Sequence, residues 1–361
     1  MSVSILVVGG GVIGLCSARE LRLAGYAVKV LDASAQMGTE ASGAGGGILS
    51  LLYPWRQTVE VKALARRSQV IYPQLAKDIS MTTGISPQYF KSGMLITALQ
   101  DSEEPLALAE DNAVKVTGSN LAYLEPGLVC ATTGVYLPAI ANIRNPVMMR
   151  ALVKDCLRLG VELYPNARVT RTLNVASSYH VMLEDGRKFA SEFMVIAAGA
   201  WSSNLLKQFG LEHQIIPIKG QMIAIRARPG VLRHIILHEG RYLIPRRDGV
   251  VLVGSTVEQT GFDKSTEPAV AEDLHDFARF VIPALGQYPV IAHWAGLRPS
   301  ISGDTPLIEQ IPNHPRVVVA TGHYRSGLVC APATAERVRS LYSEMLGHQG
   351  VGGAVQSGIM D

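Results

Sequence analysis

The fold of this chain is decided by residues 4–14, which read Ser4-Ile5-Leu6-Val7-Val8-Gly9-Gly10-Gly11-Val12-Ile13-Gly14. The apolar run 4–8 predicts a buried strand, and the residues after Gly14 predict a helix, so a glycine turn joins the two. Gly9 permits the sharp turn, Gly11 lets the backbone approach a pyrophosphate, and Gly14 lets the helix pack closely against the strand. The free N–H groups and the positive dipole end of the helix would face the phosphates.

Asp32 directly follows a second predicted strand, residues 27–31, and lies about 20 residues after the glycine turn. A carboxylate at this position accepts hydrogen bonds from the hydroxyl groups of a ribose. The strand, the glycine turn, the helix and the acid together predict a bound dinucleotide. This pattern fits both NAD and FAD.

The composition describes a well-packed globular protein. The chain has 361 residues, which is too long for one ordinary core, and we therefore expect two domains. Hydrophobic residues make up 48% and charged residues 17%, and no apolar run approaches the roughly 18 residues that a membrane span needs. A net charge of +3 with dispersed basic residues argues against a nucleic-acid partner.

The first residues carry no cationic segment before the apolar run, so we expect no signal peptide. The histidines are scattered, and the cysteines stand singly at Cys16, Cys130, Cys156 and Cys330. This spacing predicts reduced thiols and no metal site, and a cytoplasmic protein is the expected result. Composition leaves the oligomeric state open, with a homo-oligomer among the alternatives.

The order of predicted elements indicates an α/β fold, in which a Rossmann-type dinucleotide-binding domain, assigned to FAD below, carries an inserted mixed, largely antiparallel β-sheet domain. The first domain is assigned to residues 1–84, 139–216 and 291–346, and the inserted substrate-binding domain to residues 85–138 and 217–290. The glycine-rich residues 347–361 are expected to form a flexible tail.

Helical patterns recur along the chain. Helical periodicity covers residues 59–76, where Pro73 is expected to bend or end the helix. Residues 146–159 form an amphipathic pattern with Pro146 in the first turn, and a further helix is expected at 269–280. Short alternating strands occupy much of the rest, with a three-stranded meander predicted between 167 and 193.

Two later stretches favour FAD over NAD. Residues 194–201 are an apolar strand ending in small residues that include Gly199, which brings the backbone close to a ligand. Residues 315–322 form another strand, followed by a helix at 327–346 whose N-terminus would stabilise negative charge on a reduced flavin. The glycine-rich stretch 39–48 is either a flexible loop or backbone that approaches a second part of a long cofactor.

Several blocks of sequence occur in an order that a known family shares. They cover residues 9–14, 194–201, 242–246, 248–249, 254–256, 296–299, 304–306, 322–327 and 331–334. On these blocks the chain resembles the D-amino-acid-oxidase superfamily of flavoproteins and, within it, the bacterial glycine oxidases. The resemblance extends from residue 4 to about residue 346.

The resemblance implies FAD as the cofactor. Relatives that attach the flavin covalently use a cysteine after the substrate-binding arginine. Residues 300–314 contain no cysteine, so the FAD is expected to be bound non-covalently. Together, the glycine pattern and the resemblance assign to FAD the residues Gly9, Gly11, Val12, Ile13, Gly14, Asp32, Ala33, Glu40, Ala41, Gly45, Gly46, Gly47, Val169, Gly199, His323, Tyr324, Arg325, Ser326, Gly327, Leu328 and Val329.

The resemblance also implies how an amino-acid substrate is held. Arg298 matches the arginine that clamps the substrate carboxylate, for which a planar guanidinium is a bidentate partner. Arg325 matches a second position near the substrate, with a helix-capping or FAD-phosphate contact as its alternative. Tyr242 matches a tyrosine whose hydroxyl reaches the carboxylate. Val257 matches a position that shapes the side-chain pocket, where its bulk would favour small substrates.

The activity that the resemblance implies is oxidative deamination of glycine, sarcosine and small D-amino acids. Hydride passes from the substrate α-carbon to flavin N5, the imine hydrolyses to a keto acid and ammonia, and O2 reoxidises the flavin with release of hydrogen peroxide. The imine would also supply thiamine thiazole synthesis. Two alternatives stay open: a D-amino-acid or proline dehydrogenase that passes electrons to a quinone or a partner flavoprotein, and a non-catalytic FAD-binding subunit.

Overall fold

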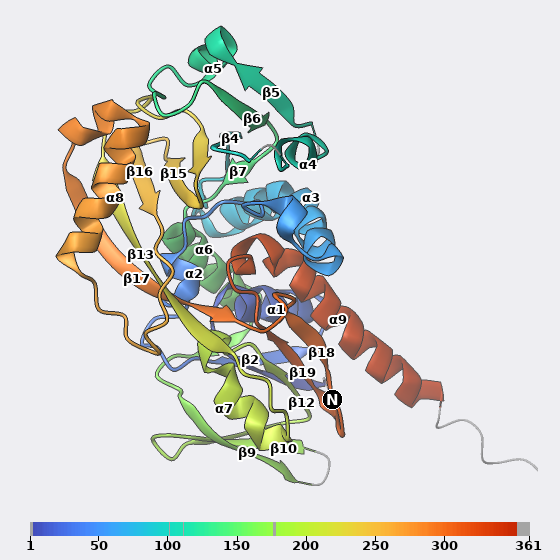
Figure 1. Ribbon diagram of the computed structural model, residues 1–361. Coiled ribbons are helices and arrows are strands. Elements are labelled where there is room, and N and C mark those ends of the chain that lie inside the picture. Colours follow the sequence, from blue (N-terminus) through green and yellow to red (C-terminus); the bar gives the residue numbers. More distant parts are fainter. Residues whose placement is uncertain (1–2, 101, 111, 176–177, 352–361) are drawn as a thin grey trace, which may run out of the picture.

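The computed structural model describes residues 3–100, 102–110, 112–175 and 178–351, and Figure 1 shows two large sheets with helices gathered around them. One sheet has six strands in the order β18-β19-β12-β1-β2-β8. β1 (Ser4–Val8) lies inside this sheet and pairs in parallel with β2 (Ala27–Leu31) and β12 (Phe193–Ile196). The remaining strands are β8 (Glu162–Tyr164), β18 (Leu307–Ile311) and β19 (His314–Thr321).

Helices cover the apolar side chains of the six-stranded sheet. They are α1 (Val12–Leu23), α3 (Val59–Thr83), α6 (Asn145–Arg158) and α9 (Gly327–Val351). Their shared core includes Ile5, Leu15, Leu152 and Tyr342, each at most 1% exposed. A fully buried aliphatic side chain contributes about 1.5–3 kcal/mol, so this core fixes α1 against β1 at the glycine turn.

Pro73 does not end α3, which continues to Thr83. The helix buries Tyr72, Leu75 and Ile79 in the core that it shares with α6 and α9. Burial of these side chains outweighs the cost of a proline in a helix interior, which is about 3 kcal/mol. Of the two effects expected of Pro73, an end of the helix is therefore wrong, because tertiary packing dominates the local backbone preference, and a bend stays a prediction.

The second large sheet has the order β17-β13-β16-β15-β14-β4-β6-β5. All of its described pairings are antiparallel except that of β4 with β14, so the expected mixed, largely antiparallel sheet is confirmed. Its strands are β4 (Met94–Thr97), β5 (Val114–Thr117), β6 (Thr133–Leu137), β13 (Ile216–Arg226), β14 (Ile235–His238), β15 (Arg241–Pro245), β16 (Val250–Gly254) and β17 (Val290–Ser300). The predicted helix α8 (Pro268–Val281) packs on this sheet.

Smaller elements complete the described chain. The predicted meander is the antiparallel sheet of β9 (Val169–Val175), β10 (Ser178–Leu183) and β11 (Lys188–Ser191). β3 (Phe90–Lys91) pairs with β7 (Ala141–Asn142). The short helices are α2 (Ala41–Ala44), η1 (Pro54–Arg56), α4 (Glu104–Leu108), α5 (Gly118–Leu124), η2 (Gly199–Trp201), α7 (Ser202–Leu206), η3 (Lys207–Phe209) and η4 (Pro283–Gln287).

The division into two domains remains a proposal. β17 forms the edge of the eight-stranded sheet beside β13, although residues 291–300 were assigned to the first domain. We propose that the boundary lies after Ser300, because this division keeps the sheet whole. α9 continues through residues 347–351 of the predicted tail, and residues 352–361 lie outside the described residues.

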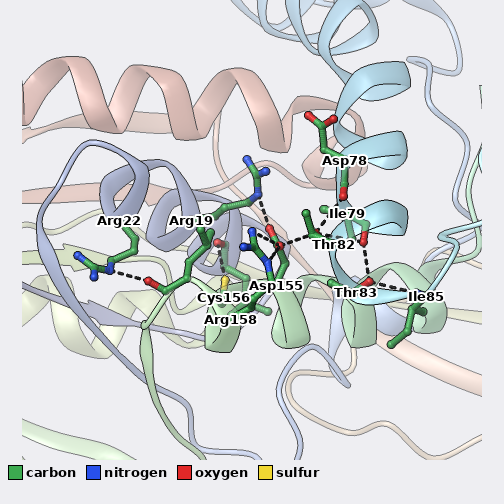
Figure 2. Close-up of polar contacts among 12 residues, drawn as sticks. Arg19, Arg22, Asp78, Ile79, Thr82, Thr83, Ile85, Asp155, Cys156 and Arg158 are labelled. Carbon is green, nitrogen blue, oxygen red and sulfur yellow. Dashed lines mark hydrogen bonds and ion pairs between the residues drawn. The ribbon is translucent and has the colours of Figure 1, made fainter.

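A buried carboxylate joins three of the helices (Figure 2). Asp155 on α6 accepts hydrogen bonds from Arg19 Nε of α1 at 2.8 Å and from Thr82 Oγ1 of α3 at 2.9 Å. Arg158 Nε and Nη2 each lie 3.1 Å from Asp155 Oδ1. Burial opposes ionisation of Asp155, but these hydrogen bonds outweigh it and hold the pKa of the carboxyl below its usual value.

Replacement of Asp155 with asparagine is expected to lower the free energy of unfolding by about 3 kcal/mol, because Arg19, only 13% exposed, would lose its buried partner and keep only Glu20, which lies 3.4 Å from Arg19 Nη1. The folded pKa of Asp155 lies below its unfolded value. The stabilisation is therefore complete above about pH 4 and is lost as the pH falls through the folded pKa. Urea denaturation of wild type and variant should show the difference at pH 7 and a smaller difference at low pH.

Asp185→Asn is the matched control, since Asp185 also pairs with an arginine, Arg187, but both side chains are solvent-exposed. We expect little change in the urea midpoint of this variant. Equal loss of stability in both variants would contradict the role given to the Asp155 cluster.

Candidate active site

A cavity of about 850 Å³ is lined by residues of both large sheets, a volume typical of ligand sites. The six-stranded sheet contributes the carboxyl ends of β1, β2, β12 and β19, where ligands bind in folds of this kind. The eight-stranded sheet contributes residues of β13, β15 and β17. All residues assigned to FAD from the sequence line this cavity except Gly14 and Val329.

The glycine turn is built as its spacing predicts. Gly9 has a φ of +114°, and a Cβ atom there would lie 2.2 Å from the carbonyl oxygen of Ala197. A Cβ atom on Gly14 would lie 1.9 Å from the carbonyl oxygen of Gly9. Gly14 thus permits close packing of α1 and does not itself reach the cavity, whereas Gly9 and Gly11 line it. The backbone N–H of Val12 donates to Ser42 Oγ at 2.9 Å.

Three carboxylates line the cavity, those of Asp32, Glu40 and Asp304. Asp32 accepts hydrogen bonds from the backbone N–H groups of Gly10, at 2.6 Å, and Ser34, at 2.8 Å. Each carboxylate oxygen has a second lone pair, so the fixed carboxylate keeps acceptor capacity for ribose hydroxyls. Glu40 accepts two hydrogen bonds of 2.9 Å from Lys264 Nζ, which ties the loop before α8 to the rim of the cavity.

The glycine-rich stretch 39–48 brings backbone to the cavity. A Cβ atom on Gly46 would lie 2.5 Å from Ile244 Cδ1. Gly47 has a φ of +80°, and its Cβ atom would lie 2.0 Å from the carbonyl oxygen of Ile143. Of the two interpretations of this stretch, the structure supports close approach of the backbone, because both glycines line the cavity and lack room for a side chain.

Two polar side chains hold this stretch and were given no role from the sequence. Arg246, 6% exposed, donates from Nη2 to the carbonyl oxygen of Gly46 at 2.8 Å and from Nη1 to Ile143 O at 2.9 Å. Burial lowers the pKa of Arg246 to about 9. Asn145 Nδ2 donates to the carbonyl oxygen of Ser42 at 2.8 Å. Within the described chain, its buried Oδ1 has no partner although Asn145 lines the cavity.

The residues after β19 form the third part of the cavity wall. Gly322 turns with a φ of +80°, and His323 to Leu328 line the cavity at the start of α9. Burial lowers the pKa of His323 to about 3, so its ring is neutral, with Nε2 3.0 Å from Thr334 Oγ1. Val329 points instead into a core cluster with Leu51 and is 2% exposed.

The residues expected near the substrate meet in the same cavity, with one exception. Tyr242 is 7% exposed, and its hydroxyl lies 3.8 Å from the sulfur of Met222. Arg298 and Arg325 both line the cavity. Burial lowers the pKa of the Arg325 guanidinium, and the nearby charge of Arg298 adds to this shift.

Val257 is the exception. It is 56% exposed and is absent from the cavity wall, so the predicted pocket-shaping role does not fit its placement. Its neighbours Thr256 and Glu258 point toward Gln221, and the alternation of side chains in extended chain turns Val257 outward. Met222, 2% exposed and beside Tyr242, is an apolar side chain that does line the cavity.

These features fit a flavin dinucleotide. A glycine turn with no room for side chains, a fixed acid, a second close approach of the backbone and an unpartnered amide oxygen all lie in the wall of one cavity. The described part of the chain contains no cluster of three or more His, Cys, Asp or Glu side chains that could hold a metal ion. Among the described helices, none has both the length and the apolar character needed to cross a membrane.

Comparison with known proteins agrees with this cavity. The family model described as FAD dependent oxidoreductase matches residues 4–341. The chain is 39% identical over 348 residues to the glycine oxidase of Pseudomonas aeruginosa, with 95% of each chain covered. It is 40% identical over 355 residues to the glycine oxidase of Pseudomonas putida, covering 96% of this chain and 95% of that protein.

A solved structure has the same architecture. The crystal structure of glycine oxidase from Geobacillus kaustophilus superimposes with a TM-score of 0.89 at 26% identity, with 94% of each chain covered. The predicted fold class, the FAD cofactor and the family resemblance are confirmed by these matches. The chain belongs to the family of FAD-dependent oxidoreductases.

Proposed function

We propose that this protein is a glycine oxidase, which deaminates glycine and other small amines such as sarcosine and small D-amino acids. The observation that carries the proposal is Arg298, which lines the same cavity as Tyr242 and the residues assigned to the cofactor. Among the described residues no acidic side chain pairs with it, so its charge is available to a substrate carboxylate. The relatives named glycine oxidase support the same substrate class.

The side chains of the cavity would position and polarise the substrate. Arg298 would bind the carboxylate through two parallel hydrogen bonds. Tyr242 and the buried Met222 would form the cavity wall next to the bound substrate. The positive charges of Arg298 and Arg325 lower the pKa of the substrate ammonium group, which favours the neutral amine that is oxidised. Bound FAD would supply the two-electron oxidising chemistry, with O2 as the final electron acceptor.

The residues expected to hold FAD are those of the glycine turn, Asp32, the stretch around Gly46 and the start of α9. The imine product hydrolyses to a keto acid and ammonia, or methylamine when sarcosine is the substrate, or the imine from glycine supplies thiamine thiazole synthesis. O2 as the acceptor and a cytoplasmic location complete the proposal. The dehydrogenase and the non-catalytic subunit have no observation of their own that favours them.

The test is peroxide production by purified, FAD-loaded protein with glycine, sarcosine, D-alanine, L-alanine, D-proline and L-proline. We expect peroxide with glycine, and more with D-alanine than with L-alanine. Flavin bleaching by substrate without peroxide in air would identify a dehydrogenase. If none of these amines gives flavin bleaching or peroxide, this absence would contradict a catalytic role.

A further inference from the structure

The guanidinium of Arg298 is held by two separate segments of the chain. Nη1 donates to the carbonyl oxygens of Lys219, at 3.3 Å, and Thr256, at 3.2 Å, and Nη2 donates to Ser255 Oγ at 2.7 Å. It also lies directly on Gly220, where a Cβ atom would be 2.0 Å from Nη2. The position of the guanidinium therefore depends on how β13 and the segment after β16 lie relative to each other.

Lys219 and Glu258 join these two segments. Their backbones exchange hydrogen bonds of 2.9 and 3.0 Å, and Lys219 Nζ lies 2.9 Å from Glu258 Oε2. The Lys219 side chain is 1% exposed and that of Glu258 is 23% exposed. A charge pair so shielded from water interacts more strongly than a surface pair, and each charge would be costly to leave alone.

Glu258 is also the centre of a hydrogen-bond network that reaches the contacts of Arg298. Its Oε1 accepts from Gln221 Nε2 at 3.0 Å and from the hydroxyl of Thr256. The Thr256 hydroxyl in turn accepts from the backbone N–H of Gln221 at 2.8 Å. Thr256 is thus fixed at its side chain by Glu258 while its carbonyl oxygen accepts from Arg298.

The charges of the network also keep Arg298 free of an acidic partner. Hydrogen bonding to Glu258 raises the pKa of the Lys219 ammonium group. Burial opposes ionisation of Glu258, but hydrogen bonds from Thr256 and Lys219 outweigh it and lower the pKa of that carboxyl. Both groups are therefore charged near neutral pH, and the negative charge of Glu258 is satisfied by Lys219 rather than by Arg298.

We propose that Lys219 and Glu258 are positioning residues for Arg298, which set the carboxylate-binding edge of its guanidinium although neither touches the substrate. The inference rests on the proposed role of Arg298 as the carboxylate clamp. It predicts a specific kinetic defect: loss of the pair should weaken binding of carboxylates while leaving oxidation of bound substrate nearly unchanged.

The test uses the FAD-loaded variants Lys219→Met, Glu258→Leu and Glu258→Gln. We expect the KM for glycine and the Kd of acetate, followed by its effect on the flavin absorption spectrum, to rise at least fivefold in each, with kcat within threefold of wild type. Glu258→Gln keeps the size of the side chain and one acceptor oxygen for Thr256 and Gln221, but removes the charge and the second acceptor that faces Lys219. If Lys219→Met or Glu258→Leu does not fold with bound FAD, the acetate Kd of Glu258→Gln alone tests the positioning role.

Asp273→Asn is the matched control. Asp273 on α8 pairs with Arg241 on β15 of the eight-stranded sheet, at 2.8 Å. In the described part of the chain, this ion pair has no hydrogen bond to the residues that hold Arg298. Its acetate Kd should equal that of wild type. A Glu258→Gln enzyme with wild-type acetate Kd, or one in which only thermal stability changes, would overturn the inference.

Failure of the proposed function gives a different result. In that case wild-type protein itself would show neither glycine oxidation nor an acetate-induced spectral change, and Arg298→Ala would alter nothing. Failure of the positioning role alone would leave the Arg298→Ala defect in place while the Lys219 and Glu258 variants bind acetate normally.

Discussion

Replacement of Gly14 with alanine is expected to give a protein that no longer retains FAD and is strongly destabilised. The new Cβ atom would lie 1.9 Å from the carbonyl oxygen of Gly9 and 3.3 Å from Val7 Cγ1. The first of these is a backbone atom of the turn itself, so α1 and the glycine turn must move apart, at a cost of about 3 kcal/mol. The flavin absorbance per protein after gel filtration, together with the thermal unfolding midpoint, measures both effects.

Gly25→Ala is the control, because it introduces backbone strain without the steric clash expected in Gly14→Ala. Gly25 has a left-handed backbone, with a φ of +94°, whereas Gly14 lies within helix α1, and nothing lies within 4 Å of the Cβ position of Gly25. Its replacement should cost only the conformational penalty of about 1–2 kcal/mol and leave FAD bound. A Gly14→Ala protein with a full complement of FAD would show that the close contact of α1 with the turn is dispensable.

The parts of the fold that the sequence predicts well are those with a local cause. Gly9 and Gly14 stand where a turn and a close helix contact leave no room for a side chain, and both constraints follow from spacing alone. The strand and helix of the C-terminal unit were likewise predicted from short periodic runs, as was α8. Local patterns of this kind therefore identify the cofactor cavity before its shape is known.

Features that depend on contacts between distant segments could not be predicted. Arg246 and Asn145 hold the stretch around Gly46 from about 100 or more residues away along the chain. Arg246 belongs to the block 242–246, but the contacts of these two residues do not follow from any local spacing. The exposed position of Val257 follows from the neighbouring Glu258 turning inward to Lys219. Such orientations are set by tertiary packing, which a single sequence does not reveal.

Replacement of Arg298 with alanine is expected to raise the KM for glycine at least 100-fold, equivalent to about 2.7 kcal/mol, while FAD stays bound. The side chain provides the charged, bidentate edge toward the cavity, and the residues of the glycine turn do not contact it. Arg298→Lys keeps the charge but not the planar fork, so its KM should lie between those of wild type and Arg298→Ala. Steady-state peroxide assays give the KM, and flavin absorbance gives the FAD content.

Arg226→Ala is the matched control, because Arg226 is an exposed arginine at the end of β13 that is not among the cavity-lining residues. This variant should have the KM of wild type, and acetate should inhibit it equally well. In Arg298→Ala, acetate should lose its competitive inhibition together with the rise in KM, since both ligands need the same guanidinium. An unchanged KM for glycine in Arg298→Ala would remove Arg298 from the carboxylate site and would leave Arg325 as the cation that binds the substrate.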